Sequence, residues 1–303
     1  MREGLIAVEP DNWRKEALIS AMRKSGGQVC SVDEASALIW AAPEEPELLT
    51  EFLRGNHDWV QLPYAGIEPF IHMLDRERLW TCGKGVYASA VAEHAFAMIL
   101  ALKRGLVEYS KSETWEKPFG TNLFDSRILI LGGGGIAQEL IPMLEPFGCA
   151  ISVVRKSGLP ISGCDNVLTL KELDGALPET DVLVVALALT SETEGLIGKE
   201  RLDLLPSHAV VVNVARGKHI VTSDLVEALR SGSLYGAGLD VTDPEPLPDG
   251  HELWGLQNCL ITPHTGNTPE MGLKLLADRI ELNVARYIAG ETLLGCVDVD
   301  EGY

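Results

Sequence analysis

Short apolar runs alternate with helix-like segments through residues 1–90. Residues 5–8, 37–40, 59–62 and 79–82 have the composition of strands, and residues 13–24, 47–54 and 69–74 predict helices between them. We expect Asp11 to cap the first helix and the pair Gly26-Gly27 to end it. Such an alternation is typical of a parallel α/β domain.

The rest of the chain continues this pattern with denser apolar runs. A long helix is predicted over residues 88–109, followed by an irregular polar arm over 108–122. Further strands are predicted at residues 128–131, 151–154, 181–187, 210–214, 237–240 and 260–262, and a last amphipathic helix at 270–289. These strands are rich in Val, Ile and Leu with little alternation, as expected for strands that are covered on both faces.

The elements predict the fold class α/β, with two Rossmann- or flavodoxin-like domains, parallel sheets and a cleft between them. We expect residues 1–93 with 270–303 to form a substrate (catalytic) domain, and residues 94–269 a dinucleotide-binding Rossmann domain. Trp40 ends a strand of the first domain. It either faces the cleft or belongs to the core, and the core is the more typical place for tryptophan.

Composition narrows the possible functions. The chain has 44 acidic and 25 basic residues and a net charge of −19, which argues against nucleic acid and anionic membranes as partners. No apolar run is long enough to span a membrane, and the first residues do not resemble a signal peptide. The six cysteines lack C-x-x-C or zinc-like spacing. We therefore expect reduced thiols in a cytoplasmic protein, and no metal site.

A glycine run follows the strand predicted at residues 128–131. The sequence Gly132-Gly133-Gly134-Gly135-Ile136-Ala137 matches G-x-G-x-x-G/A between a strand and a helix, the context of a dinucleotide cradle. Gly132 permits a tight turn, and Gly134 lets the backbone approach a pyrophosphate at the helix N-terminus. The predicted cofactor contacts here are Gly132, Gly134, Gly135 and Ile136. The alternative is a merely mobile turn. Pro142 should kink the helix that follows.

The end of the next predicted strand indicates which cofactor is bound. An NAD enzyme usually places an acidic residue there, whereas this chain has Arg155-Lys156-Ser157. A guanidinium can pair with a ribose 2′-phosphate, which a carboxylate would repel. We predict that NADP(H) is preferred and that NAD(H) is possible. The alternative is an ordinary solvated strand end.

Three polar residues downstream have the chemistry of 2-keto acid reduction. Arg216 can bind a carboxylate and polarise a carbonyl with its planar, two-pronged donor. His264 is the best proton donor, because imidazole titrates near neutral pH. Glu245 can hydrogen-bond the other ring nitrogen, which fixes the tautomer and favours the protonated ring. Taken singly, Arg216 is equally typical of a surface ion pair, Glu245 of an acidic loop and His264 of a strand end. All three, however, follow predicted strands, where open α/β sheets bind ligands.

The ordered motifs resemble a known family. They are Gln61-Leu62-Pro63-Tyr64-Ala65-Gly66-Ile67, Val91-Ala92-Glu93-His94, Leu187-Ala188-Leu189-Thr190 with Glu192-Thr193, Asn213-Val214-Ala215-Arg216-Gly217, Asp240-Val241 with Glu245-Pro246, Leu253-Trp254 and Thr262-Pro263-His264. Over nearly the whole chain this set resembles the D-isomer-specific 2-hydroxyacid dehydrogenases. One departure is Ala188, where many members carry proline, and we expect no effect on the chemistry.

The resemblance implies further site residues. A loop corresponding to Tyr64, Ala65, Gly66 and Ile67 holds the substrate carboxylate through backbone N–H groups in that family. Asp240 corresponds to the residue that holds the nicotinamide carboxamide, and the backbone of Val214 and Ala215 is expected to line the same ring. The family usually forms homodimers through its cofactor domains, which makes the arm over residues 97–122 the expected contact.

These inferences predict an oxidoreductase that transfers hydride between NADP(H) and a small 2-keto or 2-hydroxy acid of the glyoxylate or hydroxypyruvate type, with D-specificity. Some relatives of this fold act as corepressors, so a dinucleotide-sensing interaction protein is the alternative. A dehydrogenase for phosphite or formate has no dedicated cue in the sequence. We assign no role to His94, His208, His219 or His251.

Overall fold

The computed structural model describes residues 4–115 and 117–300. The chain divides into two compact units, one formed by Met1–Tyr87 with Asn267–Tyr303 and the other by Ala88–Gly266. The boundaries differ by a few residues from those expected from the sequence. We call the two compact units the first unit and the second unit.

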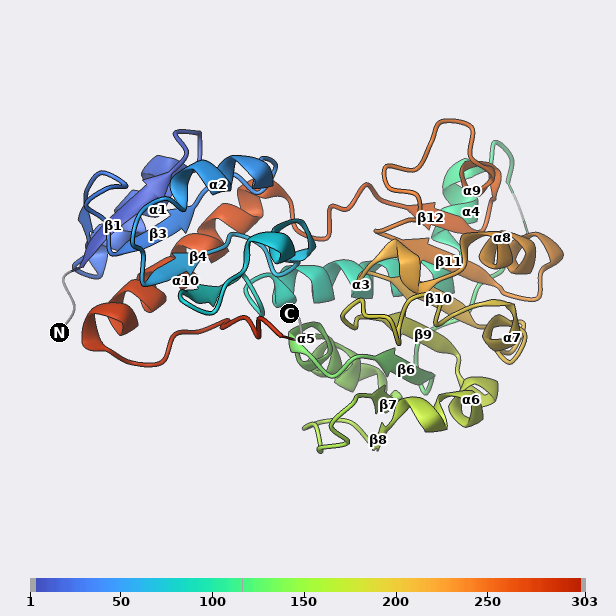
Figure 1. The fold of residues 1–303 in the computed structure, drawn as a ribbon. Helices are drawn as coiled ribbons and strands as arrows, with labels where there is room; N and C mark the ends of the chain where they lie inside the picture. The colour runs from blue at the N-terminus through green and yellow to red at the C-terminus, as the bar shows by residue number, and fades with distance from the viewer. Residues whose placement is uncertain (1–3, 116, 301–303) are drawn as a thin grey trace. The chain divides into compact units, whose positions relative to one another are not determined.

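The first unit is built on a five-stranded sheet (Figure 1). Its strands are β1 (Leu5–Glu9), β2 (Gln28–Val29), β3 (Ala37–Trp40), β4 (Trp59–Gln61) and β5 (Leu79–Thr81), all parallel in the order β2-β1-β3-β4-β5. This is the strand order of flavodoxin-like folds. The helical segments are α1 (Lys15–Lys24), η1 (Pro46–Leu48), α2 (Leu49–Phe52), η2 (Glu68–Met73) and α10 (Pro269–Ala289).

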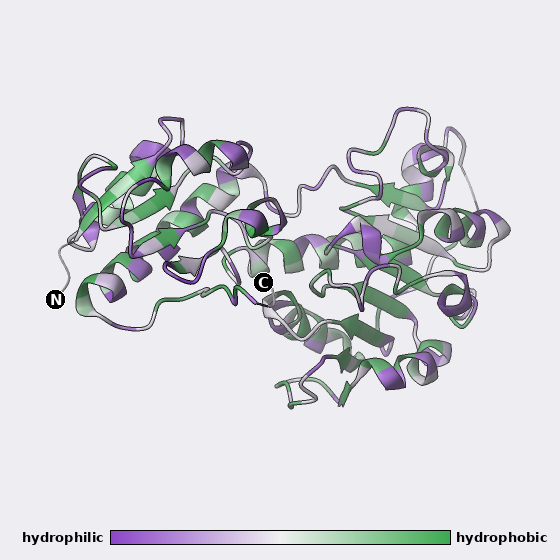
Figure 2. Cartoon of the chain, viewed as in Figure 1, coloured by the Kyte–Doolittle hydropathy of each residue, from purple (hydrophilic) through white to green (hydrophobic). Residues whose placement is uncertain are grey.

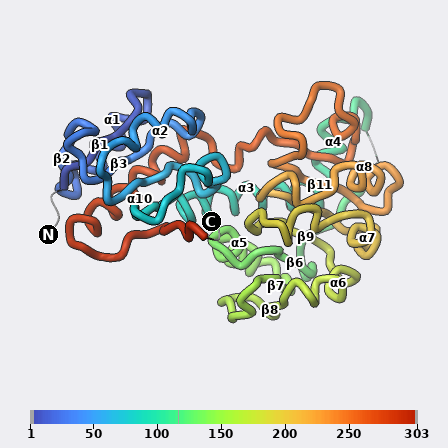
Figure 3. Tube along the Cα trace, viewed as in Figure 1, coloured from blue at the N-terminus to red at the C-terminus, as the bar shows by residue number. Residues whose placement is uncertain are grey.

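The strands of the first unit are apolar on both faces because helical segments cover both. Helices α1 and α10 lie side by side (Figure 3) and pack on the face that presents Ile6, Val8 and Ile39. The other face buries Leu38 and Trp40 under α2 and η2. Trp40 is 0% exposed, and its Nε1–H donates to Ala42 O at 2.7 Å. It is therefore a core residue.

The second unit contains a seven-stranded parallel sheet in the order β12-β11-β10-β9-β6-β7-β8. The strands are β6 (Arg127–Leu131), β7 (Ala150–Val154), β8 (Asn166–Leu168), β9 (Val182–Val185), β10 (Val210–Asn213), β11 (Gly236–Leu239) and β12 (Cys259–Ile261). This is the Rossmann order with one added edge strand, and the order reverses between β6 and β9.

Helices cover both faces of this sheet, so its strands are almost uniformly hydrophobic (Figure 2). The helices are α3 (Ala88–Lys103), α4 (Leu106–Lys111), α5 (Gly135–Leu144), α6 (Leu173–Ala176), α7 (Lys199–Leu202), α8 (Thr222–Ser231) and α9 (Glu252–Gly255), with short 3₁₀ segments η3 (Glu145–Phe147), η4 (Leu170–Glu172), η5 (Leu177–Glu179) and η6 (Gly217–His219). Helices α3 and α5 pack on one face and α6, α7 and α8 on the other.

The predicted α/β class with two parallel sheets is confirmed, and the differences are local. The sequence did not predict the short strands β2 and β8. The predicted helix over residues 88–109 divides into α3 and α4, because Gly105 adopts a left-handed conformation (φ 65°) between them. The expected cap by Asp11 is wrong, since Asn12 Oδ1 accepts the N–H of Arg14 (2.9 Å) before the first turn.

Helix α5 continues through Pro142 to Leu144. No helix among residues 4–115 and 117–300 is long and apolar enough to cross a membrane.

Candidate active site

The residues predicted to form the site follow five strands of the second unit. Gly132 follows β6, Arg155 follows β7, Arg216 lies beyond β10, Asp240 follows β11, and His264 lies three residues beyond β12. Parallel strands bring all their carboxyl ends to one edge of the sheet, which is where open α/β folds bind ligands. We call this edge the carboxyl edge.

The glycine turn sits where the strand order reverses. Gly132 has φ 106°, and a Cβ there would lie 2.4 Å from Ala186 O, just after β9. Only glycine fits both constraints. Gly134 is the N-cap of α5 without a side-chain cap, and a Cβ there would meet nothing within 4 Å. Gly135 and Ile136 are the first residues of α5, so their N–H groups have no partner within the helix and suit a pyrophosphate.

The Arg155 side chain lies against this glycine turn. A Cβ built on Gly133 would lie 3.0 Å from Arg155 Cδ and 3.2 Å from Nε. Arg155 Nη1 donates to Leu159 O at 3.4 Å, and Lys156 and Ser157 are exposed. Residues at the ends of β6 and β7 thus place a cation beside the turn, and a guanidinium can pair with a phosphate group.

Two tight contacts fix the loop that carries Arg216. Asn213, which is 1% exposed, donates from Nδ2 to Arg216 O (2.9 Å) and accepts the Ala215 N–H (3.1 Å). A Cβ on Gly217 would lie 1.9 Å from Thr242 O. The loop after β10 can therefore lie directly against the segment that leads to Glu245. Val214 and Ala215 are buried, and Arg216 is half-buried with its Nη1 2.8 Å from Ala215 O.

His264 and Glu245 form a close pair. The distance between His264 Nδ1 and Glu245 Oε1 is 2.6 Å. Their side chains are 53% and 40% exposed, so the pair is open to solvent on this unit. Because Nδ1–H donates to the carboxylate, Nε2 is the ring atom that can exchange a proton with a ligand. His264 has a positive φ of 51°, and its N–H donates to Asp240 O at 2.8 Å.

The Asp240 carboxylate holds the turn around His264. It is 3% exposed and accepts hydrogen bonds from Thr262 Oγ1 (2.6 Å), Thr265 N (2.8 Å) and Gly266 N (3.0 Å). Burial raises the pKa of Asp240, but the hydrogen bonds, first those from His94 and Thr262, outweigh it and lower the pKa to about 2. The expected contact of Asp240 with a nicotinamide carboxamide stays a prediction.

His94 belongs to this cluster, although its role was not predicted from the sequence. Its Nε2 lies 3.0 Å from Thr262 Oγ1 and 3.4 Å from Asp240 Oδ1. The available signal was the motif that ends at His94, on a helix whose neighbours were unknown. His219 and His251 have structural positions, since His219 is buried between two backbone carbonyls and His251 Nδ1 accepts the Leu253 N–H at the start of α9.

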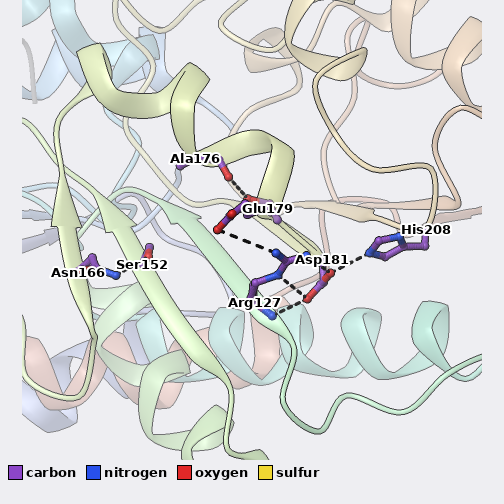
Figure 4. Close-up of polar contacts among 8 residues, drawn as sticks. Arg127, Ser152, Asn166, Ala176, Glu179, Asp181 and His208 are labelled. Carbon is purple, nitrogen blue, oxygen red and sulfur yellow. Dashed lines mark hydrogen bonds and ion pairs between the residues drawn. The ribbon is translucent and has the colours of Figure 1, made fainter.

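A second charged cluster lies at the opposite, amino-terminal edge of the sheet (Figure 4). Asp181 accepts from Arg127 N (2.7 Å) and Nη2 (3.2 Å), and His208 Nε2 lies 2.8 Å from its Oδ1. Burial raises the pKa of Asp181, but the hydrogen bonds from Arg127 and His208 lower it to about 2. Because this edge is remote from the strand ends that bind ligands, we regard the cluster as structural. We call it the Asp181 cluster.

The predicted substrate loop lies in the first unit, between β4 and η2. In the described part of the chain, the backbone N–H groups of Ala65, Gly66 and Ile67 have no protein acceptor. Tyr64 is 41% exposed, whereas the Ile67 side chain is 2% exposed and anchors the loop in the core. Free, adjacent N–H groups suit a carboxylate.

No group of three or more His, Cys, Asp or Glu residues among those that the structure describes could hold a metal ion.

Comparison with known proteins defines the family. Residues 96–266 match the family model described as D-isomer specific 2-hydroxyacid dehydrogenase, NAD binding domain. A Corynebacterium melassecola protein, described only as lying in the proB 3′ region, is 38% identical and aligns over 98% of this chain and 99% of its own length. The glyoxylate reductase of Pyrococcus furiosus is 32% identical over 68% of this chain and 65% of that reductase.

Solved structures agree with the sequence comparison. The D-isomer specific 2-hydroxyacid dehydrogenase from Xanthobacter autotrophicus Py2, solved in complex with NADPH and MES, is 26% identical, has a TM-score of 0.84 and aligns over 100% of both chains. The relatives place the chain among the NAD(P)-dependent oxidoreductases, and its two parallel sheets with a glycine turn at the switch point agree with that class. The chain belongs to the D-isomer specific 2-hydroxyacid dehydrogenase family, and the resemblance inferred from its motifs is confirmed.

Proposed function

We propose that this enzyme uses NADPH to reduce a short 2-keto acid, of the glyoxylate or hydroxypyruvate type, to the D-2-hydroxy acid. The observation that carries the proposal is the 2.6 Å pair of His264 and Glu245, placed at the same sheet edge as the glycine turn. The names of relatives support the substrate class, since several are glyoxylate reductases and one is a hydroxyphenylpyruvate reductase.

Each residue has a defined task in this proposal. The bound nicotinamide supplies a hydride to the carbonyl carbon. Arg216 binds the substrate carboxylate and stabilises the negative charge that develops on the carbonyl oxygen. His264 donates the proton from Nε2 to that oxygen, and Glu245 holds the ring through Nδ1 and stabilises it while it is positively charged. The N–H groups of the Tyr64–Ile67 loop give the carboxylate a second anchor.

NADPH is proposed over NADH because the end of β7 carries Arg155, Lys156 and Ser157 in place of an acid. The Arg155 side chain lies against the glycine turn, so a 2′-phosphate bound there would meet a guanidinium. One structural relative was solved with NADPH. A higher kcat/KM with NADH than with NADPH would contradict this part of the proposal.

We also propose a cytoplasmic homodimer that binds neither nucleic acid nor membranes. The large apolar side chains Leu106, Trp115, Phe119 and Phe124 are exposed in or just beyond the arm expected at the contact. Such a concentration of exposed apolar surface is typical of an interface. The net charge of −19 disfavours polyanionic partners.

The test is NADPH and NADH oxidation measured with a panel of 2-keto acids. We expect His264→Ala to lower kcat by about 10²–10⁴-fold, the usual contribution of a positioned proton donor, while the Kd for NADPH changes little. His72→Ala is the matched control, since His72 is exposed and contacts only Glu47 (3.5 Å) among the pairs that the structure describes. A near-normal rate for His264→Ala would contradict the assigned role. No turnover by the native enzyme, together with cofactor-dependent association, would favour a dinucleotide sensor.

A further inference from the structure

The ring of His219 lies between two loops at the carboxyl edge of the second unit. His219 ends η6, three residues beyond Arg216, and it is 0% exposed. Its Nδ1 lies 2.9 Å from Thr193 O, and its Nε2 lies 3.1 Å from Leu187 O. Both oxygens belong to residues 186–193, which follow β9 and which we call the β9 loop. The motif in this loop has no part in the chemistry described above.

The β9 loop connects the glycine turn to the loop that carries Arg216. At its start, a Cβ on Gly132 would lie 2.4 Å from Ala186 O. At its end, Thr193 is buried, and its Oγ1 donates to Ala188 O at 2.9 Å, which folds the loop on itself. Because the loop is folded in this way, a restraint at Thr193 also limits the motion of its start.

Either of the two ring contacts joins the same pair of loops. A neutral imidazole has one N–H, and burial lowers the pKa of His219, which keeps the ring neutral at neutral pH. The ring therefore donates to one of two carbonyls that both belong to the β9 loop. Backbone bonds join the residues that follow, from Gly195 N to Lys218 O (2.8 Å) and from Ile197 N to His219 O (2.9 Å). His219 extends this link into the β9 loop itself.

We propose that His219 is a positioning residue that holds the β9 loop against the loop carrying Arg216 and so sets the spacing between Arg216 and the glycine turn. The inference rests on the proposed function, in which the glycine turn holds the cofactor and Arg216 holds the keto acid. Hydride transfer needs the reacting atoms about 3–3.5 Å apart, and a misplacement of about 1 Å can lower the rate about 10²-fold. Because the ring is fully buried, it acts through the two loops and not on the reactants.

The test replaces His219 in the full chain and measures kcat with glyoxylate and hydroxypyruvate, counted per NADPH-binding site. His219→Leu and His219→Met fill the space but cannot donate, and each should lower kcat about 10–100-fold. The Kd for NADPH should change little, because the glycine turn itself is kept.

Two amide variants test for recovery of the hydrogen bond. The amide nitrogen of asparagine can take the place of ring Nδ1, and that of glutamine the place of ring Nε2. His219→Asn or His219→Gln should therefore recover kcat at least about threefold over His219→Leu, the equivalent of one net hydrogen bond. A merely structural role would lower the amount of folded protein and leave kcat per binding site unchanged.

His57→Leu is the matched control, because His57 is also a buried ring between two backbone carbonyls. His57 is 2% exposed and lies 3.0 Å from both Ala35 O and Phe52 O, in segments of the first unit that carry no predicted site residue. This variant should lose stability and keep its kcat per binding site. Hydrogen exchange should become faster in the β9 loop of His219→Leu and stay unchanged there in His57→Leu.

Several results would overturn the inference. They are a wild-type kcat in His219→Leu or His219→Met, a loss that neither amide variant reduces, an equal loss in His57→Leu, and unchanged exchange in the β9 loop of the His219 variants. Each of these leaves the proposed function intact. If the wild-type enzyme reduces none of the keto acids, the proposed function fails and the inference fails with it.

Discussion

Replacing Asp240 by asparagine tests whether this carboxylate holds the turn that carries His264. The substitution keeps the size of the side chain but removes its charge and turns one acceptor atom into a donor. Both oxygens already face N–H or O–H groups, from Thr262, Thr265 and Gly266. The new NH₂ group must therefore oppose a donor, whichever way the amide is placed.

The expected loss of stability follows from these contacts. A hydrogen bond to a charged group contributes about 1.5–3 kcal/mol, and removing one partner from a buried charged network costs about 3–5 kcal/mol. The pKa gives a separate figure, since a fall from an ordinary value of about 3.9 to about 2 corresponds to roughly 2–3 kcal/mol. We expect Asp240→Asn to lower the free energy of unfolding by about 2–4 kcal/mol at pH 7.

The contribution has a definite pH dependence. Because the pKa is lowered in the folded state, the stabilisation is complete above the unfolded pKa, near pH 4, and is lost as the pH falls through about 2. The difference between wild type and Asp240→Asn should therefore be constant from about pH 7 to 5 and shrink below about pH 4. Urea unfolding across this range measures it.

The kcat of Asp240→Asn should fall by more than the loss of folded protein explains. A left-handed conformation at a residue other than glycine costs about 1–2 kcal/mol, and His264 adopts it at φ 51°. Without the Asp240 contacts the turn should relax, so kcat of the folded variant should drop at least about tenfold. Asp249→Asn, at an exposed aspartate, is the control. A variant that unfolds within about 0.5 kcal/mol of wild type and retains its kcat would refute this reasoning.

Three other substitutions test separate features. Gly217→Ala should lower the unfolding free energy by more than about 2 kcal/mol and reduce kcat, because its Cβ would lie 1.9 Å from Thr242 O; wild-type thermal stability would show that the two loops separate freely. Arg155→Ala should raise the Kd for NADPH about 10–100-fold and leave that for NADH nearly unchanged, and fluorescence titration with both cofactors decides it. Asp181→Asn should destabilise the protein by roughly 2–3 kcal/mol at pH 7, because Arg127 and His208 hold the carboxylate. The difference should decline below about pH 4, where the carboxylate takes up a proton in the unfolded state, and be lost as the pH falls through about 2. Equal unfolding midpoints at pH 7 would contradict this expectation.

Most of the sheet architecture could be predicted because long apolar runs mark buried parallel strands. Such runs mark most strands of the second unit, and the ends of these strands indicate Arg216, Asp240 and His264 as site residues. The exceptions are β2 and β8, which are short edge strands. Their segments are too short and too polar to give a periodic signal.

Contacts between distant segments could not be predicted. The position of His94 beside Thr262 depends on how α3 packs against the end of β12, which no local pattern reveals. The same holds for Gly217, whose need for glycine comes from a close approach of Thr242 and not from its own φ.

The separation between the Asp181 cluster and the carboxyl edge has a practical consequence for altering this enzyme. The Asp181 cluster stabilises one end of these strands, and the residues proposed to select the cofactor and the acid lie at the other end. The rigid apolar strands lie between them. Directed evolution can therefore change the cofactor or acid that is accepted by varying one rim, while losses in folding are repaired at the other rim. Substitutions chosen from the two rims should combine with nearly additive effects, because they share no contacts.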